Sequence, residues 1–253
     1  MNVLAVYNSK GGVGKTATAV NLAHQAAQHG YRTLLWDLDP QGAATFYLRV
    51  PHRLRGGTRA LTTKRHRIGE RIVGTDIEGL DVLPSDQELR HIDVVFDATK
   101  HRTRRLSRVV EELSTEGYDL LIIDCPPSSS LVAENIFHAA HVLVVPVVPS
   151  TLSVRTLELL DQTLLSMTDR RPATVVFFSM ADGRKKLHRQ VMAELRATRT
   201  DLATTVIPAA TDVELMGTER APVATFAPSS PAARAYRGLW GELVARGYTE
   251  RAP

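Results

Sequence analysis

Residues 8–21, NSKGGVGKTATAVN, constrain the fold of this chain more than any other segment. They follow an apolar, β-branched run at residues 2–8, which predicts a buried strand. They lead into a pattern of helical spacing that stops near Gly30. A glycine-rich turn between a strand and a helix collects backbone N–H groups at the positive end of the helix. The segment therefore predicts a phosphate-binding loop.

The same segment fits the pattern G-x-x-x-x-G-K-[ST], with Asn8 or Ser9 where the first glycine usually stands. We expect Lys15 to reach the β- and γ-phosphates of a nucleotide and the Thr16 hydroxyl to hold Mg²⁺. The alternative is a glycine-rich turn with accidental lysines, which the flanking strand and helix disfavour. The residues expected to contact the nucleotide here are Lys10, Gly11, Gly12, Val13, Gly14, Lys15, Thr16 and Ala17.

Beyond the loop, apolar runs alternate with helical patterns along the whole chain. Strands are expected at 32–39, 80–85, 118–127, 141–150, 173–180 and 204–208. Helices are expected near 86–97, 101–116, 152–168, 185–198 and 230–246, and residues 42–72 as mixed helix and loop. Several strands are apolar on both faces, which is typical of parallel sheets covered by helices. We predict a single α/β domain over 1–253, with a mostly parallel twisted sheet flanked by helices on both faces.

Three acids are expected at strand ends beside the loop. Asp37 and Asp39 end the strand at 32–39, and their spacing places both on one face of a strand. Within the strongly apolar segment 118–127, Asp124 lies at the expected end of the strand, as a Walker B acid does. Carboxylates at these positions can position a metal ion and an attacking water. The alternative for Asp37 and Asp39 is a turn or helix cap ahead of Gly42.

The composition of the chain indicates in which compartment of the cell it is expected. Of the 253 residues, 43% are apolar and 23% are charged, which suits a soluble globular domain, and the apolar runs are too short to cross a bilayer. The single cysteine, Cys125, cannot form an internal disulfide, and the first strand begins too close to Met1 to leave room for a signal peptide. We expect a cytoplasmic protein.

The net charge of +4 is small, but basic residues gather in three stretches, 49–71, 100–108 and 183–190. Such clusters can neutralise phosphates along a DNA duplex. The alternative is that each is a solvated helix face. The nine histidines show no metal-ligand spacing, and we expect no catalytic metal ligands among them.

The segment KGGVGKT (10–16) resembles the deviant Walker A box of the ParA/MinD superfamily of dimerising ATPases. The resemblance implies that Lys15 acts in its own site, whereas Lys10 reaches across a dimer interface to the partner's phosphates. It makes Lys10, Lys15 and Asp39 the catalytic residues, with ATP and Mg²⁺ as cofactors. It also assigns Asp39 to the attacking water, and it puts Asp37 and Asp124 at or near the metal, usually through water. The candidate metal residues are thus Thr16, Asp37, Asp39 and Asp124.

Later segments extend the resemblance over nearly the whole chain. DLDPQGAAT (37–45) and DCPPS (124–128) are similar to family segments, with Ala43 where an asparagine is usual and Ala17 in place of a second threonine. The resemblance implies that Asp182 lies close to the nucleotide and that Pro208 packs on adenine. Ala209 replaces an arginine that helps some relatives bind DNA. DNA contact is therefore expected elsewhere, at Arg184, Lys185, Lys186, Arg189, Arg196 and Arg199.

The function implied is that of a ParA-type partition or positioning ATPase. Such a protein dimerises on binding ATP, binds nucleoid DNA without reading its sequence, and releases it after hydrolysis stimulated by a ParB-like partner on the cargo. The cargo is a plasmid, a chromosome origin or a protein assembly such as a carboxysome. Because the phosphate loop comes first, we expect no separate N-terminal DNA-binding domain.

Two alternatives on the same fold remain. One is a MinD-like membrane switch, which requires a basic amphipathic C-terminal helix. The tail at 234–253 has an apolar stripe at Leu239, Trp240 and Leu243, which fits packing on the domain better, so no membrane attachment is expected. The other is a dethiobiotin-synthase-like enzyme that uses ATP on a small substrate. The related nitrogenase iron protein needs two cysteine ligands per subunit, and one cysteine excludes it.

Overall fold

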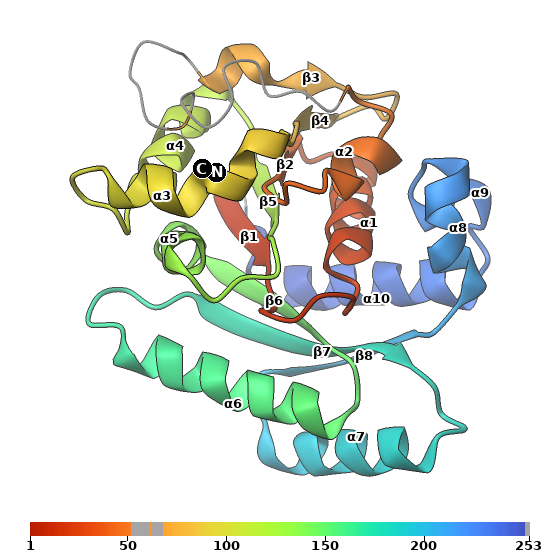
Figure 1. Cartoon of the computed structure of the whole chain (residues 1–253). Coiled ribbons are helices and arrows are strands. Elements are labelled where there is room, and N and C mark those ends of the chain that lie inside the picture. The colour runs from red at the N-terminus through yellow and green to blue at the C-terminus, as the bar shows by residue number, and fades with distance from the viewer. Residues whose placement is uncertain (52–60, 62–67, 251–253) are drawn as a thin grey trace.

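The computed structural model describes residues 1–51, 61 and 68–250, and it forms an α/β layer structure (Figure 1). Within these residues, eight strands make one sheet in the order β3-β4-β2-β5-β1-β6-β7-β8. The short β3 (Val73–Gly74) pairs antiparallel with β4, and all the other pairings are parallel. The sheet confirms the mostly parallel architecture expected from the sequence.

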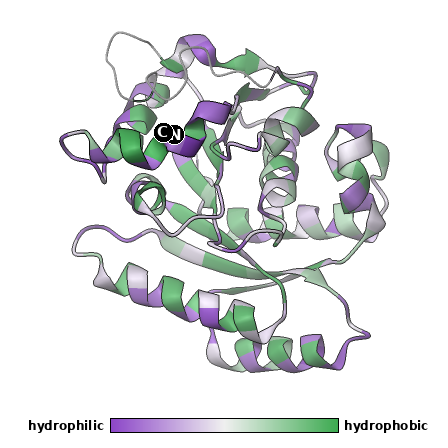
Figure 2. Cartoon of the chain, viewed as in Figure 1, coloured by the Kyte–Doolittle hydropathy of each residue, from purple (hydrophilic) through white to green (hydrophobic). Residues whose placement is uncertain are grey.

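The strands match the expected apolar runs, with shorter limits for β1, β2, β4, β5 and β6 and slightly longer ones for β7 and β8. They are β1 (Asn2–Val6), β2 (Thr33–Asp37), β4 (Leu80–Leu83), β5 (Leu120–Asp124), β6 (Val142–Val147), β7 (Ala173–Ala181) and β8 (Leu202–Pro208). Residues of β2, β5 and β6 are buried throughout, because helices cover both faces of the sheet. Figure 2 shows the central strands as predominantly hydrophobic.

One face of the sheet packs against the middle of the chain. Val3, Trp36, Ile123 and Phe178 project to this side and share one apolar core with the helices. The covering elements are α3 (Ile92–Asp97), α4 (Arg105–Leu113), α5 (Leu131–Ala139), α6 (Thr151–Ser166) and α7 (Lys186–Thr198). Short 3₁₀ turns occur at Ile68–Arg71, Gln87–His91 and Ser114–Glu116.

The other face packs against both ends of the chain. Leu4, Leu35, Ile122 and Phe177, the neighbours of the first set along their strands, form a second apolar core. This alternation follows from the period of two in a β-strand. The covering helices are α1 (Lys15–Gln28), α2 (Ala43–Tyr47), α8 (Thr211–Glu219), α9 (Val223–Phe226) and α10 (Pro231–Ala245).

Three helices lay outside the sequence prediction: α5, α8 and α9. Helix α5 buries six of its nine residues, but it is shorter than the window of about 11–18 residues over which helical periodicity is read. Helix α8 is also hard to predict from the sequence, because Met216 is its one buried residue and no apolar stripe runs along it. In both cases tertiary packing, rather than periodicity, supports the helix.

The described helices include none that is long and apolar enough to span a bilayer. Leu239, Trp240 and Leu243 of α10 are buried in the second core, as expected for packing on the domain. Most of the basic stretch 49–71 lies outside the described residues, including His52 and His66.

Asn135 ties α5 to the start of α4 and to the segment before it. Its side chain is fully buried, and its Oδ1 accepts hydrogen bonds from the backbone N–H groups of Arg105 (2.7 Å) and Leu106 (3.3 Å). Its Nδ2 donates to the carbonyls of Arg102 (2.7 Å) and Leu131 (2.9 Å). Removing this amide would leave several backbone groups without a partner away from water.

We therefore predict that Asn135→Ala lowers the free energy of unfolding by roughly 2–4 kcal/mol, because buried unpaired polar groups cost about 1–3 kcal/mol each. Urea unfolding followed by circular dichroism measures this change. Glu134→Ala, an exposed neighbour on the same helix, is the control and should shift stability by less than about 0.5 kcal/mol. Equal losses in the two variants would contradict the assignment.

Candidate nucleotide site

The glycine loop and the predicted acids meet at one edge of the sheet. In the register of the central strands, Val6 of β1 lies beside Asp124 of β5, and Asp124 lies beside Asp37 of β2. The loop leaves β1 next to this row. Open parallel sheets bind ligands at the carboxyl ends of their strands, since the loops there diverge. This arrangement confirms that the three segments come together, as the strand-end positions predicted.

The loop has the backbone shape that its glycines allow. Gly12 and Gly14 have φ values of 69° and 91°, and Gly14 precedes the first residue of α1. A Cβ atom on Gly14 would lie 2.8 Å from Oγ of Ser179, whereas one on Gly11 or Gly12 would meet nothing within 4 Å among the described residues. The loop therefore presents open space above Gly11 and Gly12, a cradle that a phosphate can fill without a side chain in the way.

Asn8 fixes the start of the loop. Its Nδ2 donates to the carbonyl of Pro146 on β6 (2.8 Å), and its Oδ1 accepts from the backbone N–H of Lys10 (2.9 Å). The side chain of Lys10 is partly exposed and has no hydrogen-bond or ion-pair partner within the described ranges. The backbone at Lys10 is thus held while its ammonium group remains available.

Lys15 has a different environment. Its side chain is buried, and Nζ donates to the carbonyl of Lys10 (2.9 Å). Burial lowers the pKa of Lys15, and the nearby charges of Asp124, Cys125 and Asp39 oppose that shift. A cation held in a dehydrated position beside the glycine cradle is stabilised further by an anion placed there.

Asp124 is a buried acid with unmet hydrogen-bonding capacity. It is fully buried, and neither carboxylate oxygen has a hydrogen-bond partner in the described part of the chain. Burial, followed by the charge of Asp37, raises the pKa of Asp124 well above its usual range. The Thr16 hydroxyl lowers that pKa, so it lies close to the carboxylate, although outside hydrogen-bond geometry.

Asp37 is also fully buried, but one of its carboxylate oxygens accepts hydrogen bonds. Its Oδ2 accepts from both the backbone N–H and the hydroxyl of Thr45, each at 2.7 Å. Thr45 Oγ1 in turn accepts from the backbone N–H of Ser85 (3.0 Å), which follows β4. The other oxygen of Asp37 has no partner among the described residues. Burial is the largest cause of its raised pKa.

Asp39 departs from the sequence prediction. Strand β2 ends at Asp37, so Asp39 lies in the following turn and not on the same strand face. Its Oδ1 accepts from the backbone N–H of Gln41 (2.9 Å), and its carbonyl accepts from Gly42 (2.9 Å) and from the Ser85 hydroxyl. The turn and the catalytic interpretation are compatible, because the turn leaves the carboxylate partly exposed at the site.

The site fits a hydrated Mg²⁺ better than a directly caged one. Among the described residues, no group of three or more His, Cys, Asp or Glu side chains is arranged to hold a metal ion. Unpartnered oxygens of Asp124 and Asp37 beside the Thr16 hydroxyl instead suit an ion that keeps several waters, as Mg²⁺ usually does in nucleotide sites.

The remaining nucleotide candidates lie together on the outer strands. Pro208 pairs with Ala181 in the register of β8 and β7, and Asp182 follows Ala181 directly. Arg184 donates to both oxygens of Asp182 at 3.0 Å and lowers the pKa of that carboxyl to about 2. The backbone N–H of Asp182 donates to Nδ1 of His188 on α7 (3.0 Å). Whether Asp182 and Pro208 contact a nucleotide stays a prediction.

Comparison with known proteins agrees with this geometry. A family model described as an AAA domain matches residues 1–175. The chromosome-partitioning ATPase Soj of Thermus thermophilus is 36% identical over 251 residues, which cover 96% of this chain and 95% of Soj. The chromosome partitioning protein ParA of Caulobacter vibrioides is 32% identical over 258 residues, which cover 97% of this chain and 95% of ParA. The chain belongs to the ParA family.

Solved structures place the ParA-family chain on the expected fold of a P-loop NTPase. Cobyrinic acid a,c-diamide synthase from Mycobacterium smegmatis, with a bound ATP analogue and magnesium, has a TM-score of 0.78 and 27% identity, over 100% of this chain and 98% of that one. A Cyanothece McdA variant in complex with ATP has a TM-score of 0.82 over 100% of this chain and 99% of that one. Its 20% identity shows a shared fold.

The basic residues expected to contact DNA do not form a uniform set in this ParA-family chain. Arg199 does not belong among the candidate DNA contacts. Its side chain is only 17% exposed, and its guanidinium group is ion-paired with Asp161 (2.6 Å) and Asp201 (2.8 Å). This cluster joins α6 to the start of β8. Exposed positions on or beside the first half of α7 remain, and they are Arg184, Lys185, Lys186 and Arg189. Arg196 is also exposed, with its guanidinium 5.8 Å from the centre of the Phe178 ring.

The structure adds residues that the sequence did not suggest for a ParA-family site. Thr45, Ser85 and Asn8 hold the acids and the loop through hydrogen bonds, yet they come from three separate segments. A hydroxyl or amide in a loop carries no local pattern that identifies its partner. Only the pairing of β2 with β4 and of β1 with β6 brings these groups to the loop and the acids.

The raised pKa values give a prediction about pH. An acid whose pKa is raised by folding contributes its full stability below its unfolded pKa, about 4, and loses it as pH rises through the folded pKa. We expect Asp124→Asn to raise the thermal midpoint of the nucleotide-free protein at pH 7, by roughly 2–4 °C for each kcal/mol regained. The gain should shrink toward pH 4.

Thermal scans between pH 4 and pH 7 measure this difference. Glu158→Gln, which removes an exposed carboxylate on α6, is the matched control and should leave the midpoint nearly unchanged across the range. A lower midpoint for Asp124→Asn than for the parent at pH 7 would show that the buried charge is compensated in the folded state.

Proposed function

We propose that this chain is an ATP-driven dimerisation switch that binds DNA in one nucleotide state and releases it in the other. The observation that carries the proposal is the contrast between two lysines in one loop. Lys15 is buried and hydrogen-bonded beside the cradle, whereas Lys10 is held by its backbone and keeps an unpaired side chain within the described structure. Partition relatives and the ParA-type loop support the same conclusion.

Each subunit has the groups to bind Mg²⁺ and ATP by itself. The backbone over Gly11 and Gly12 would surround the phosphates, with Lys15 neutralising their charge. The Thr16 hydroxyl would hold the metal, and Asp37 and Asp124 would hold its waters. When bound, Mg²⁺ supplies the positive charge that polarises the phosphoryl oxygens. Asp182 and Pro208 are proposed to contact the far end of the nucleotide.

Lys10 is proposed to act on the partner's nucleotide. A cation delivered from a second subunit stabilises charge that develops on the transferred phosphoryl group, as an arginine finger does. It also makes the dimer interface part of the nucleotide site. Binding of ATP and formation of the dimer then become one coupled equilibrium, which requires that ATP favours the dimer and that ADP does not.

Asp39 is proposed to orient and activate the attacking water. Asp39 lies in the turn after β2, at the same edge of the sheet as Lys15, and its carboxylate is partly exposed. Its charge acts to raise the pKa of Lys15. The anchoring of its turn through Ser85 limits its movement. Slow turnover without a partner, and faster turnover with a ParB-like activator on the cargo, would time release from DNA. This activity requires a cytoplasmic, nucleoid-associated protein.

DNA binding is proposed to use the exposed basic residues at the start of α7. Lys185 and Lys186 are exposed, and they lie three and four residues after Asp182, the nucleotide candidate. Contacts of this kind go to phosphates and carry no sequence information. The cargo in this proposal is a plasmid, a chromosome origin or a protein assembly.

The switch predicts a change in molar mass measured by light scattering. Asp39→Ala should slow hydrolysis by about 10²–10⁴-fold and trap the ATP state. With ADP it should have a mass near the 27.8 kDa of one chain, and with ATP about twice that. Lys10→Ala/Asp39→Ala should stay monomeric with ATP, because the cation that bridges the subunits is missing.

Tight ATP binding by both variants, measured by calorimetry, is the control for an intact site. An ATP-dependent dimer that survives the loss of Lys10 would contradict the role of this lysine in trans. One mass in every condition would contradict the switch and favour an enzyme that acts on a small substrate, the alternative on this fold.

The proposed DNA surface predicts a salt effect. In the ATP state, Lys185→Ala/Lys186→Ala should weaken binding to random duplexes and reduce the slope of log K against log salt by about 0.9 for each phosphate that is no longer neutralised. Fluorescence anisotropy over a range of salt concentrations measures both. Arg237→Ala on α10, an exposed arginine whose helix packs on the opposite face of the sheet, should change neither. Equal slopes in all three proteins would place the DNA surface elsewhere.

A further inference from the structure

Two arginines of the described structure adopt a backbone conformation that usually belongs to glycine. Arg49 lies two residues after the end of α2 and has a φ of 58°, and Arg220 directly follows α8 and has a φ of 48°. A left-handed backbone is strained for a residue with a large side chain, and such strain persists where surrounding contacts hold it. The contacts of the two guanidinium groups explain why arginine stands at both positions.

Each arginine binds the end of the other's helix. Nη2 of Arg49 donates to the carbonyl of Glu219 (3.0 Å), and its Nε donates to the carbonyl of Arg220 (3.2 Å). In return, Nε of Arg220 donates to the carbonyl of Phe46 on α2 (3.1 Å), and its Cζ lies 4.5 Å from the centre of the Phe46 ring. The last carbonyls of a helix have no partner within it, and cationic donors suit them. Arg49 and Arg220 thus form an arginine interlock between the C-terminal ends of α2 and α8.

Helix α8 is the fixed side of the arginine interlock. Its Met216 is fully buried, and Nδ2 of Asn21 on α1 donates to the Met216 sulfur (3.2 Å). Oδ1 of Asn21 accepts from the backbone N–H of Val223, the first residue of α9 (2.9 Å). Helices α8 and α9 are therefore held to α1, the helix that begins at Lys15 of the phosphate loop.

Helix α2 is the side that holds the acids. Thr45 precedes Phe46, and both its backbone N–H and its hydroxyl donate to Asp37. Thr45 Oγ1 also accepts from the backbone N–H of Ser85, whose own hydroxyl donates to the carbonyl of Asp39. Helix α2 has five residues, too few to be stable through its own hydrogen bonds. The position of Thr45 therefore depends on contacts of α2 with its neighbours, and the arginine interlock is one of them.

We propose that Arg49 and Arg220 are positioning residues for ATP hydrolysis, a role that rests on the proposed function of the chain as an ATPase. The bonds of both side chains go to α2, to the end of α8 and to Asp76, so they act on the reacting groups through α2. The arginine interlock fixes α2 against α8. Thr45 then holds the Asp37 carboxylate in one orientation, and the turn that contains Asp39 stays in place beside it.

Glycine variants separate this role from a purely local one. Arg220→Gly removes the guanidinium group and also relieves the strain of a positive φ. With the arginine interlock broken, we expect the Thr45 amide of the nucleotide-free chain to exchange with solvent about tenfold faster, as measured by NMR. The kcat for ATP should fall about tenfold or more while KM changes less than about twofold, because misplaced groups slow the chemical step and the loop still binds ATP. Arg220→Asn, which also tolerates a left-handed backbone, repeats the test.

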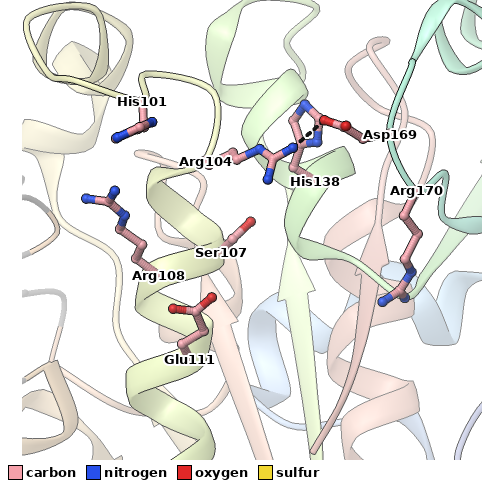
Figure 3. Close-up of a pocket in the computed structure, with 8 residues that line it drawn as sticks. All are labelled: His101, Arg104, Ser107, Arg108, Glu111, His138, Asp169 and Arg170. Atoms are coloured by element: carbon pink, nitrogen blue, oxygen red, sulfur yellow. Dashed lines mark hydrogen bonds and ion pairs between the residues drawn. The ribbon is translucent and has the colours of Figure 1, made fainter.

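His101→Gly is the matched control. His101 is also exposed and has a φ of 61°, and it lines a recess together with Arg104, Ser107 and Glu111 (Figure 3). This recess is on the side of the sheet that α4 covers, whereas α2 and α8 cover the other face. The change should therefore alter neither the exchange of the Thr45 amide nor kcat.

Arg49→Gly should act like Arg220→Gly. The two changes together should cost less than the product of the single effects, because either one breaks the same arginine interlock. Unchanged exchange of the Thr45 amide in Arg220→Gly and Arg220→Asn would overturn the proposal, and faster exchange with an unchanged kcat would overturn the positioning role. A parent chain that hydrolyses no ATP would instead contradict the proposed function, and the exchange of the Thr45 amide then decides by itself whether the arginine interlock holds α2.

Discussion

The pairing of β1 with β5 and of β5 with β2 is the constraint on which the candidate site depends. It puts the carboxyl ends of three buried strands in one row, so that Asp37, Asp124 and the start of the glycine loop are neighbours despite their separation in sequence. Helices on both faces keep these strands dry. The acids at their ends are therefore dehydrated by the fold itself, and their altered pKa values follow from position.

This dehydration lowers the stability of the empty protein around the site. Both oxygens of Asp124 lack a partner among the described residues, and the Lys15 ammonium is buried with a backbone carbonyl as its hydrogen-bond acceptor. Each of these groups is better accommodated once opposite charge or hydrogen-bonding water enters the site. A site of this kind stabilises its ligand at the expense of the empty protein. In the proposed switch, that difference between the empty and loaded states would drive association.

The edge that carries the site is also linked to the surface proposed to bind DNA. The backbone of Asp182 donates to His188 on α7, and Arg184 bonds to the Asp182 carboxylate. The exposed lysines at the start of α7 lie within this short segment. Farther along, Arg199 locks the end of α7 to α6 through Asp161. The first turn of α7 thus connects to the nucleotide edge, whereas the segment after its last turn is anchored to a neighbouring helix.

The sequence by itself determined the phosphate loop, the strand-end acids and the alternating α/β order. These features rest on local rules, in which glycine permits φ values that other residues avoid and apolar runs of strand length must be buried. Tertiary structure decided what depends on distant partners. It placed Asp39 in a turn rather than on the strand, withdrew Arg199 into an ion-pair cluster and recruited Thr45 and Ser85 to hold the acids. It also formed α5, whose nine residues are too few for a helical period to stand out in the sequence. The residues around a charged or hydroxyl side chain do not show which distant residue it will bind, because strand pairing across the sheet decides which side chains come close together.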